Sequence, residues 1–249
     1  MIEQSRISAI NGPAPSVFPF PGFLGIVMLD TRFPRPPGDI GNPETFPMPT
    51  RRVVIDGAWP EKVVQTASGL RANKLLVAFS RMVQQLERDG AAAITTSCGF
   101  LVLLQRELQS VVKVPVVTSS LLLLPGLLAR ERRVGVLTIS ARRLEPAHLR
   151  SAGVPRDRLG DVVVQGVDPS GEFAGAILGN RAEMDLAQAE AEVVAAAQAL
   201  KARAPSLQTV VLECTNMPPY AQALMQATGL RALSLRDAPA LFRPFGVVP

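Results

Sequence analysis

The stretch Ala-Ala-Ile-Thr-Thr-Ser-Cys-Gly-Phe at residues 92–100 is an apolar run that ends at Cys98. A second stretch, Thr-Val-Val-Leu-Glu-Cys-Thr-Asn-Met at residues 209–217, repeats this pattern around Cys214, the other of the two cysteines in the chain. Each stretch predicts a buried β-strand that passes through a cysteine into a helix. Backbone N–H groups at a helix start favour a thiolate and a bound anion. Two such junctions that face each other would place one thiol on either face of a substrate carbon.

Strands alternate with helices along the 249 residues, which predicts parallel sheets and right-handed crossovers. The expected strands are residues 23–29, 53–56, 92–97, 114–117, 133–139, 161–166, 209–213 and 230–235. The expected longer helices are residues 74–88, 101–110 and 185–203. Because the second half repeats the scheme of the first, we predict an α/β fold of two pseudo-symmetric lobes, each a parallel-rich sheet flanked by helices. The active site would lie in the cleft between the lobes, at the carboxyl ends of the strands.

The chain is expected to cross between the two lobes twice. Residues 17–118 and 229–249 are predicted to form lobe 1, which would contribute Cys98. Residues 119–228 are predicted to form lobe 2, which would contribute Cys214. The segment 30–50 contains six prolines and therefore cannot be helical. A connection of this length in a compact domain is usually functional, so we expect a lid that defines the substrate.

Charge and hydropathy exclude several classes of partner. The net charge of +5 comes mostly from scattered arginines, without a basic stretch interleaved with aromatic residues, so no nucleic-acid partner is expected. No apolar run reaches the roughly 18–20 residues of a membrane span. Residues 1–16 also lack the apolar core of a signal peptide. We therefore expect a cytoplasmic protein with no membrane partner, whose cysteines are free thiols rather than a disulfide.

The residue inventory predicts neither a cofactor nor a metal site. No G-x-x-x-x-G-K-[ST] or G-x-G-x-x-G motif is present, so a nucleotide has no anchor. Zinc needs three or four closely spaced ligands, whereas this chain has one histidine and two distant cysteines. The four lysines lie among polar residues, which disfavours a Schiff base with pyridoxal phosphate. His148 is expected on a helix surface and lies far along the chain from either cysteine, so a Cys/His nucleophile is disfavoured.

The two thiols are suited to moving a proton from one face of a carbon to the other. That chemistry needs one thiolate and one thiol, and a helix N-terminus lowers a thiol pKa from about 8.5. The carbanion that forms beside a carboxylate or carbonyl needs fixed donors. The backbone N–H groups of Gly99, Phe100, Thr215 and Asn216 are the candidates, with the Thr215 hydroxyl beside them. A regular strand would point Glu213 away from its neighbouring cysteine.

These features resemble the aspartate/glutamate racemase superfamily, from Phe23 to about Leu235. The superfamily includes amino-acid and hydantoin racemases, maleate cis-trans isomerases and arylmalonate decarboxylases. The matching residues are Asp30-Thr31, Thr96-Ser97-Cys98, Pro115-Val116-Val117, Val134-Gly135-Val136-Leu137-Thr138 and Glu213-Cys214-Thr215. The resemblance implies one catalytic cysteine from each lobe and no cofactor. It also implies a small-molecule substrate, either a carboxylate or a hydantoin, and a homo-oligomer, which we expect to be a dimer.

The resemblance assigns roles to particular residues. Cys98 and Cys214 would be the acid/base thiols. Asp30 and Thr31 would line the site, although a turn or cap is the alternative for Asp30. Thr138 and Ser140 would help hold the substrate, and helix capping is their alternative. Thr215 follows the second cysteine as in many members of the superfamily.

One departure concerns the substrate. Amino-acid racemases commonly have Asn-Thr after the first cysteine, whereas this chain has Gly99-Phe100. This exchange replaces polar contacts with an aromatic wall, which argues against glutamate or aspartate as the substrate.

The leading functional prediction is a cofactor-independent racemase or epimerase that uses both cysteines at a carbon next to a carboxylate or carbonyl. The alternative within the superfamily is a cysteine-dependent cis-trans isomerase, or a decarboxylase or other lyase. A third hypothesis from another class is a two-lobed protein that binds a small anion without catalysis.

Overall fold

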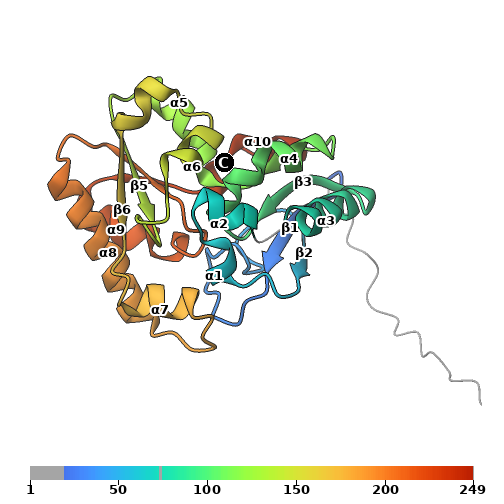
Figure 1. Ribbon diagram of the computed structural model, residues 1–249, viewed down its shortest axis with the longest axis horizontal. Helices are drawn as coiled ribbons and strands as arrows, with labels where there is room; N and C mark the ends of the chain where they lie inside the picture. The colour runs from blue at the N-terminus through green and yellow to red at the C-terminus, as the bar shows by residue number, and fades with distance from the viewer. Residues whose placement is uncertain (1–19, 73–74, 249) are drawn as a thin grey trace, which may run out of the picture.

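The computed structural model describes residues 20–72 and 75–248, which form two α/β lobes that lie side by side (Figure 1). One lobe contains a sheet with the strand order β2-β1-β3-β4, and the other contains a sheet with the order β6-β5-β7-β8. All neighbouring strands are parallel. The strands are β1 (Phe23–Leu29), β2 (Thr50–Ile55), β3 (Ala91–Thr96), β4 (Val116–Val117), β5 (Val134–Thr138), β6 (Val162–Gly166), β7 (Thr209–Leu212) and β8 (Arg231–Leu233). The two strand orders correspond one to one, which confirms the predicted pseudo-symmetric α/β architecture.

Helices connect the strands in each lobe. In the first lobe they are α1 (Pro60–Val63), α2 (Ala67–Ala72), α3 (Leu76–Arg88) and α4 (Gln105–Ser110). The second lobe has α5 (Leu124–Leu128), α6 (Pro146–Ser151), α7 (Glu172–Leu178), α8 (Leu186–Arg203) and α9 (Ala221–Thr228), and α10 (Pro239–Phe242) follows. The helix expected at residues 101–110 is instead a 3-10 helix, η1 (Gly99–Leu104), followed by α4. Lys74, the expected first residue of α3, lies outside the described residues.

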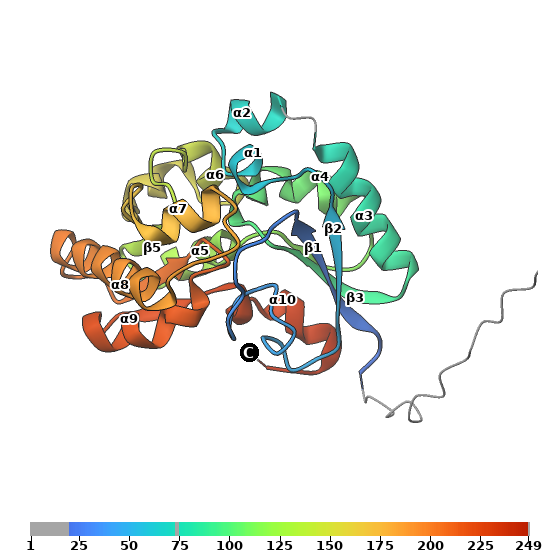
Figure 2. The same ribbon diagram turned by 90° about the horizontal axis from the view of Figure 1, so that it is seen from below.

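The first sheet is covered on both faces, as is typical of parallel sheets. Alternation along β1 sends Val27 and Leu29 into the large core that also holds Phe79 of α3. Leu24 and Ile26 point to the opposite face, into a second core. Figure 2 shows α3 on one side of β1–β3 and α10 on the other.

The second core joins segments that are far apart in the sequence. It combines strand residues of the first sheet with the proline-rich segment and the last described helices, through Ile40, Phe46, Met48, Leu235, Leu241, Phe242 and Phe245. The predicted return of the chain to lobe 1 at residue 229 therefore needs a correction. Residues 231–233 form β8, which pairs with β7 of the second sheet, because Val210 and Val211 offer it a free edge. The chain rejoins the first lobe only from Leu235 onward.

The proline-rich segment is folded against both lobes. Asp39 and Ile40 are buried within it. The Ile40 N–H donates to the Thr215 carbonyl at 3.3 Å, and Asn216 Nδ2 donates to Asp39 Oδ2 at 2.7 Å. These bonds fasten the segment to the loop that carries Cys214. The role of a lid stays a prediction.

Two expectations concern parts of the chain that the structure describes incompletely. Residues 1–16, for which no signal peptide is expected, and residues 17–19 of the predicted lobe 1 lie outside the described residues. Within residues 20–72 and 75–248, no helix has both the length and the apolar character needed to cross a membrane.

Candidate active site

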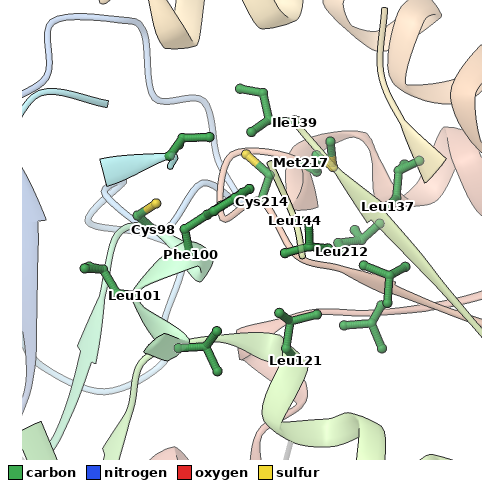
Figure 3. Close-up of a cluster of buried hydrophobic side chains, with 14 of the residues drawn as sticks. Cys98, Phe100, Leu101, Leu121, Leu137, Ile139, Leu144, Leu212, Cys214 and Met217 are labelled. Atoms are coloured by element: carbon green, nitrogen blue, oxygen red, sulfur yellow. The ribbon is translucent and has the colours of Figure 1, made fainter. Parts of the chain in front are cut away.

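The pseudo-symmetry of the sheets places the two cysteines at equivalent positions. Cys98 follows β3 and Cys214 follows β7, and these strands hold the same place in their respective sheets. Both are free thiols and both are buried. Figure 3 shows them coming from different lobes and flanking Phe100. The two predicted strand-to-helix junctions therefore meet at the interface between the lobes.

Both thiols line one narrow cavity between the lobes. Its volume is about 20 Å³, which is room for about one water molecule. A substrate therefore enters only if side chains or lobes move apart. The cavity is lined by Leu29, Thr31, Phe33, Pro60, Val64, Ser97, Cys98, Gly99, Phe100, Ile139, Ile177, Glu213, Cys214, Thr215 and Asn216. Most of the wall is apolar, and the polar groups come from the loops after β1, β3 and β7.

Cys98 sits in extended backbone (φ −152°, ψ 121°) directly before η1. The N–H groups of Phe100 and Leu101 at the start of η1 lower the thiol pKa, as the sequence predicts. Burial and the nearby Glu213 carboxylate outweigh them, and the net effect is a pKa well above the ordinary value. The expectation that a helix N-terminus produces a ready thiolate is thus wrong for Cys98 in the closed site.

Burial and the Glu213 carboxylate also act on Cys214, the thiol that the second lobe contributes. Its Sγ donates to Asn216 Oδ1 at 3.6 Å. Burial raises its pKa, the Glu213 carboxylate raises it further, and the Asn216 backbone N–H opposes both effects. Both thiols are therefore protonated in this conformation, and a thiolate needs a compensating positive charge or better solvation.

Glu213 is the functional candidate that strand alternation missed. β7 ends at Leu212, so the residues after it no longer alternate between faces, and Glu213 and Cys214 both line the cavity. Thr138 Oγ1 donates to Glu213 Oε2 at 2.7 Å, while Oε1 has no hydrogen-bond partner. Burial raises the Glu213 pKa from 4.5 to about 7. A carboxylate that titrates near neutrality therefore stands beside two thiols.

Gly99 makes room for this carboxylate. A Cβ atom at Gly99 would collide with the backbone carbonyl and Oε1 of Glu213. A glycine is needed after the first cysteine for a steric reason, because only a residue without a side chain lets the second lobe's carboxylate approach the first lobe's backbone.

The remaining predicted site residues divide into two groups. Thr31, Phe100, Thr215 and Asn216 line the cavity. The Thr215 hydroxyl is occupied in the contact between the lobes, because Oγ1 donates to the Ser97 carbonyl at 2.8 Å.

Asp30, Thr138 and Ser140 do not line the cavity. Asp30 Oδ2 accepts from the Gly57 N–H and from Trp59 Nε1, so it has the alternative role of fixing a turn. The Thr138 hydroxyl donates a hydrogen bond to Glu213. Ser140 is half-buried, and its N–H donates to Thr138 Oγ1 at 3.4 Å.

His148 is buried, which corrects its expected surface position. Its ring stands edge-on to the ring of Phe100, with centroids 5.0 Å apart, and Nδ1 accepts from the Glu145 N–H at 3.1 Å. Burial lowers its pKa. His148 thus supports the aromatic wall from behind. A Pro-x-His helix start gives no hint of this packing in the sequence.

Arg35 and Asp39 form a partly buried ion pair beside the site, which no sequence pattern indicates. Arg35 NH1 contacts Asp39 Oδ1 at 2.6 Å, and NH2 donates to Thr31 Oγ1 at 2.6 Å. Asp39 in turn accepts from Asn216. This network links the loop after β1 with the loop after Cys214.

Two parallel α/β lobes that share a cavity, with one thiol from each, are the arrangement that the resemblance to the aspartate/glutamate racemase superfamily implies. The chain belongs to the Asp/Glu/hydantoin racemase family, whose family model matches residues 47–239. The predicted resemblance is therefore confirmed.

Curated relatives carry the name of a lyase. The chain is 30% identical to a dimethylsulfoniopropionate lyase of Durusdinium sp. clade D over 214 residues, which are 83% of this chain and 69% of the relative. It is 29% identical to dimethylsulfoniopropionate lyase 3 of Emiliania huxleyi (strain CCMP1516) over 217 residues. This match covers 83% of the chain but 55% of that relative, so the chain spans about half of its length.

Solved structures share the fold at low identity. Unliganded arylmalonate decarboxylase superposes with a TM-score of 0.52 at 16% identity, over 89% of this chain and 90% of that one. A glutamate racemase of Bacillus anthracis superposes with a TM-score of 0.54 at 15% identity, over 89% and 82%. The chain is thus an enzyme of this superfamily, in which both lyases and racemases have the same two-lobed fold.

Proposed function

We propose that this enzyme is a cofactor-independent lyase that removes a proton from the carbon next to a substrate carboxylate and expels a leaving group from the adjacent carbon. The observation that carries the proposal is the pair of thiols on one small apolar cavity, in a chain 30% identical to a named dimethylsulfoniopropionate lyase. Dimethylsulfoniopropionate is therefore the first substrate to test.

The reaction is a β-elimination. One thiolate, Cys98 or Cys214, takes the proton, and the C–H electrons form the new C=C bond. The C–S bond breaks with its electron pair going to sulfur, so that neutral dimethyl sulfide and acrylate are released. The charges balance, because the thiolate becomes a thiol and the zwitterionic substrate becomes a neutral sulfide and a carboxylate. The other thiol would hydrogen bond to the substrate carboxylate.

The narrow apolar cavity supports this chemistry. Leu29, Phe33, Val64, Ile139 and Ile177 leave little room for water beside a bound substrate, which would shield a carbanion-like transition state from quenching. The Phe100 and Leu101 N–H groups at the start of η1 stabilise the thiolate form of Cys98, which the reaction needs as its base.

The test is the release of dimethyl sulfide, measured by gas chromatography, and of acrylate, measured by NMR. The wild-type protein is compared with Cys98→Ser and Cys214→Ser. We expect product from the wild type and a loss of about a hundredfold or more in at least one variant, with melting temperatures close to wild type. Turnover that survives in both serine variants would exclude a thiol base.

Racemisation or epimerisation is the second candidate, and the pseudo-symmetric thiols favour it. Their equivalent positions after β3 and β7 bring one acid/base group from each lobe, as a two-base proton transfer needs. Solvent deuterium uptake at the α-carbon distinguishes this reaction. A panel of amino acids, hydantoins and hydroxy acids in D₂O should exchange without elimination if the enzyme is a racemase.

A further inference from the structure

The charges on the cavity wall are unbalanced. Among the described residues that line it, Glu213 is the only carboxylate, and none is a lysine, arginine or histidine. Arg35 is a neighbouring cation, but NH1 is held by Asp39 and NH2 by Thr31. The titratable groups that share the cavity with Glu213 are the thiols of Cys98 and Cys214. A negative charge on Glu213 therefore has no cationic partner within the described wall.

The carboxylate is anchored through one oxygen, and its residue forms part of the cavity wall. Thr138 binds Oε2, and the side chain is 1% exposed. Oε1 has no hydrogen-bond partner, and it borders the position where a Gly99 side chain would be. An ionised carboxylate that is buried without a cationic partner is unfavourable, and a cation in the cavity would offset that cost. The geometry therefore calls for a positive charge on the ligand side of Glu213.

The rest of the wall selects the kind of cation. Phe33 and Phe100 bring aromatic rings, and Leu29, Val64 and Ile177 bring aliphatic surface. Such a wall solvates methyl groups well and offers little to a strongly hydrated ammonium. Methylated onium groups carry their charge on an apolar exterior and bind near aromatic rings and carboxylates. A dicarboxylate, in contrast, would bring a second negative charge against Glu213.

We propose that Glu213 is a specificity-determining residue that holds the cationic onium group of a zwitterionic β-onium carboxylate, and so excludes neutral and dianionic carboxylates. This assignment rests on the proposed function, because the onium group is the leaving group of the elimination. The substrate's cation also offsets the negative charge that raises the pKa of both thiols. The thiolate thus forms when a cationic substrate is bound and is disfavoured in its absence.

The experiment compares two ligands of nearly identical shape by calorimetry. 3-(Trimethylammonio)propanoate carries the cation, and 4,4-dimethylpentanoate replaces its nitrogen with carbon. Trimethylamine is a poor leaving group, so binding is measured without turnover. At about pH 8.5, where Glu213 with a pKa of about 7 is ionised, the wild type should bind the onium ligand roughly tenfold tighter or more. Glu213→Gln should bring the two affinities within about twofold.

A matched variant separates the local effect from general electrostatics. Glu61→Gln removes an exposed carboxylate from α1, next to the cavity residue Pro60, and should keep the preference. Wild type should also lose the preference on acidification to about pH 5.5, because Glu213 then becomes protonated. This pH series decides the question if Glu213→Gln does not fold.

Three results would overturn the proposal. They are equal binding of both ligands by wild type, a preference retained in Glu213→Gln, or binding of neither ligand at millimolar concentration. A protein that shows the preference but releases no dimethyl sulfide would refute the lyase function alone. A lyase without the preference would refute the role of Glu213 alone.

Discussion

Replacing Glu213 by glutamine should change how the stability of the protein depends on pH. Burial raises the pKa of this carboxyl from 4.5 to about 7, so the folded protein holds the proton more tightly than the unfolded chain does. The resulting stabilisation is complete below about pH 4.5 and is lost as the pH rises through 7. At 1.36 kcal/mol for each tenfold change in proton affinity, the rise of this pKa from 4.5 to about 7 corresponds to about 3 kcal/mol.

The assay is urea unfolding followed by circular dichroism, at pH values from about 5 to about 8.5. Wild type should lose about 3 kcal/mol of unfolding free energy relative to Glu213→Gln across this range. Other carboxylates, such as Glu172 and Glu192, titrate in both proteins and cancel in the difference. The reasoning would be refuted if the two stability curves ran parallel, because Glu213 would then be ionised at every pH tested or exposed to solvent.

Two further predictions concern the same cavity. Gly99→Ala should cost about 1–3 kcal/mol of unfolding free energy, since the new Cβ overlaps the backbone and carboxylate of Glu213. The matched control is Gly126→Ala in α5, where a Cβ meets nothing within 4 Å. This control variant should be as stable as the wild type or more stable. A Gly99→Ala protein as stable as the control would show that the two lobes approach less closely here. Iodoacetamide should alkylate Cys98 and Cys214 at least about tenfold more slowly in the native protein than in urea, because both thiols are buried with raised pKa values. Peptide mass spectrometry reads both rates, and native rates equal to those in urea would contradict the buried, protonated state.

Much of the fold could be predicted because its signals are local. The apolar runs before Cys98 and Cys214 form β3 and β7, and alternation with helices fixes a parallel arrangement. Asp185 caps α8 with two hydrogen bonds from its first turn, as an aspartate before a long helical pattern indicates. α7 was not predicted, since its seven residues with two glycines among the neighbours carry a weak helical period.

The site was harder to predict because its decisive details depend on where an element stops. Alternation directs Glu213 away from Cys214, but β7 ends one residue before Glu213, and this single position turns the carboxylate into the cavity. The thiol pKa values also depend on burial between two lobes, which overrides the local helix start. His148 lies 50 positions from Cys98 (148 minus 98) and reaches Phe100 only through tertiary packing.

The second core gives the first lobe an unusual assembly order. Leu24 and Ile26 of β1 are packed against Leu241 and Phe242, which follow all of the second lobe in the chain. During synthesis, the part of this face that Leu241 and Phe242 cover therefore stays exposed until the second lobe has been made. The first lobe is therefore the first to begin and the last to be completed.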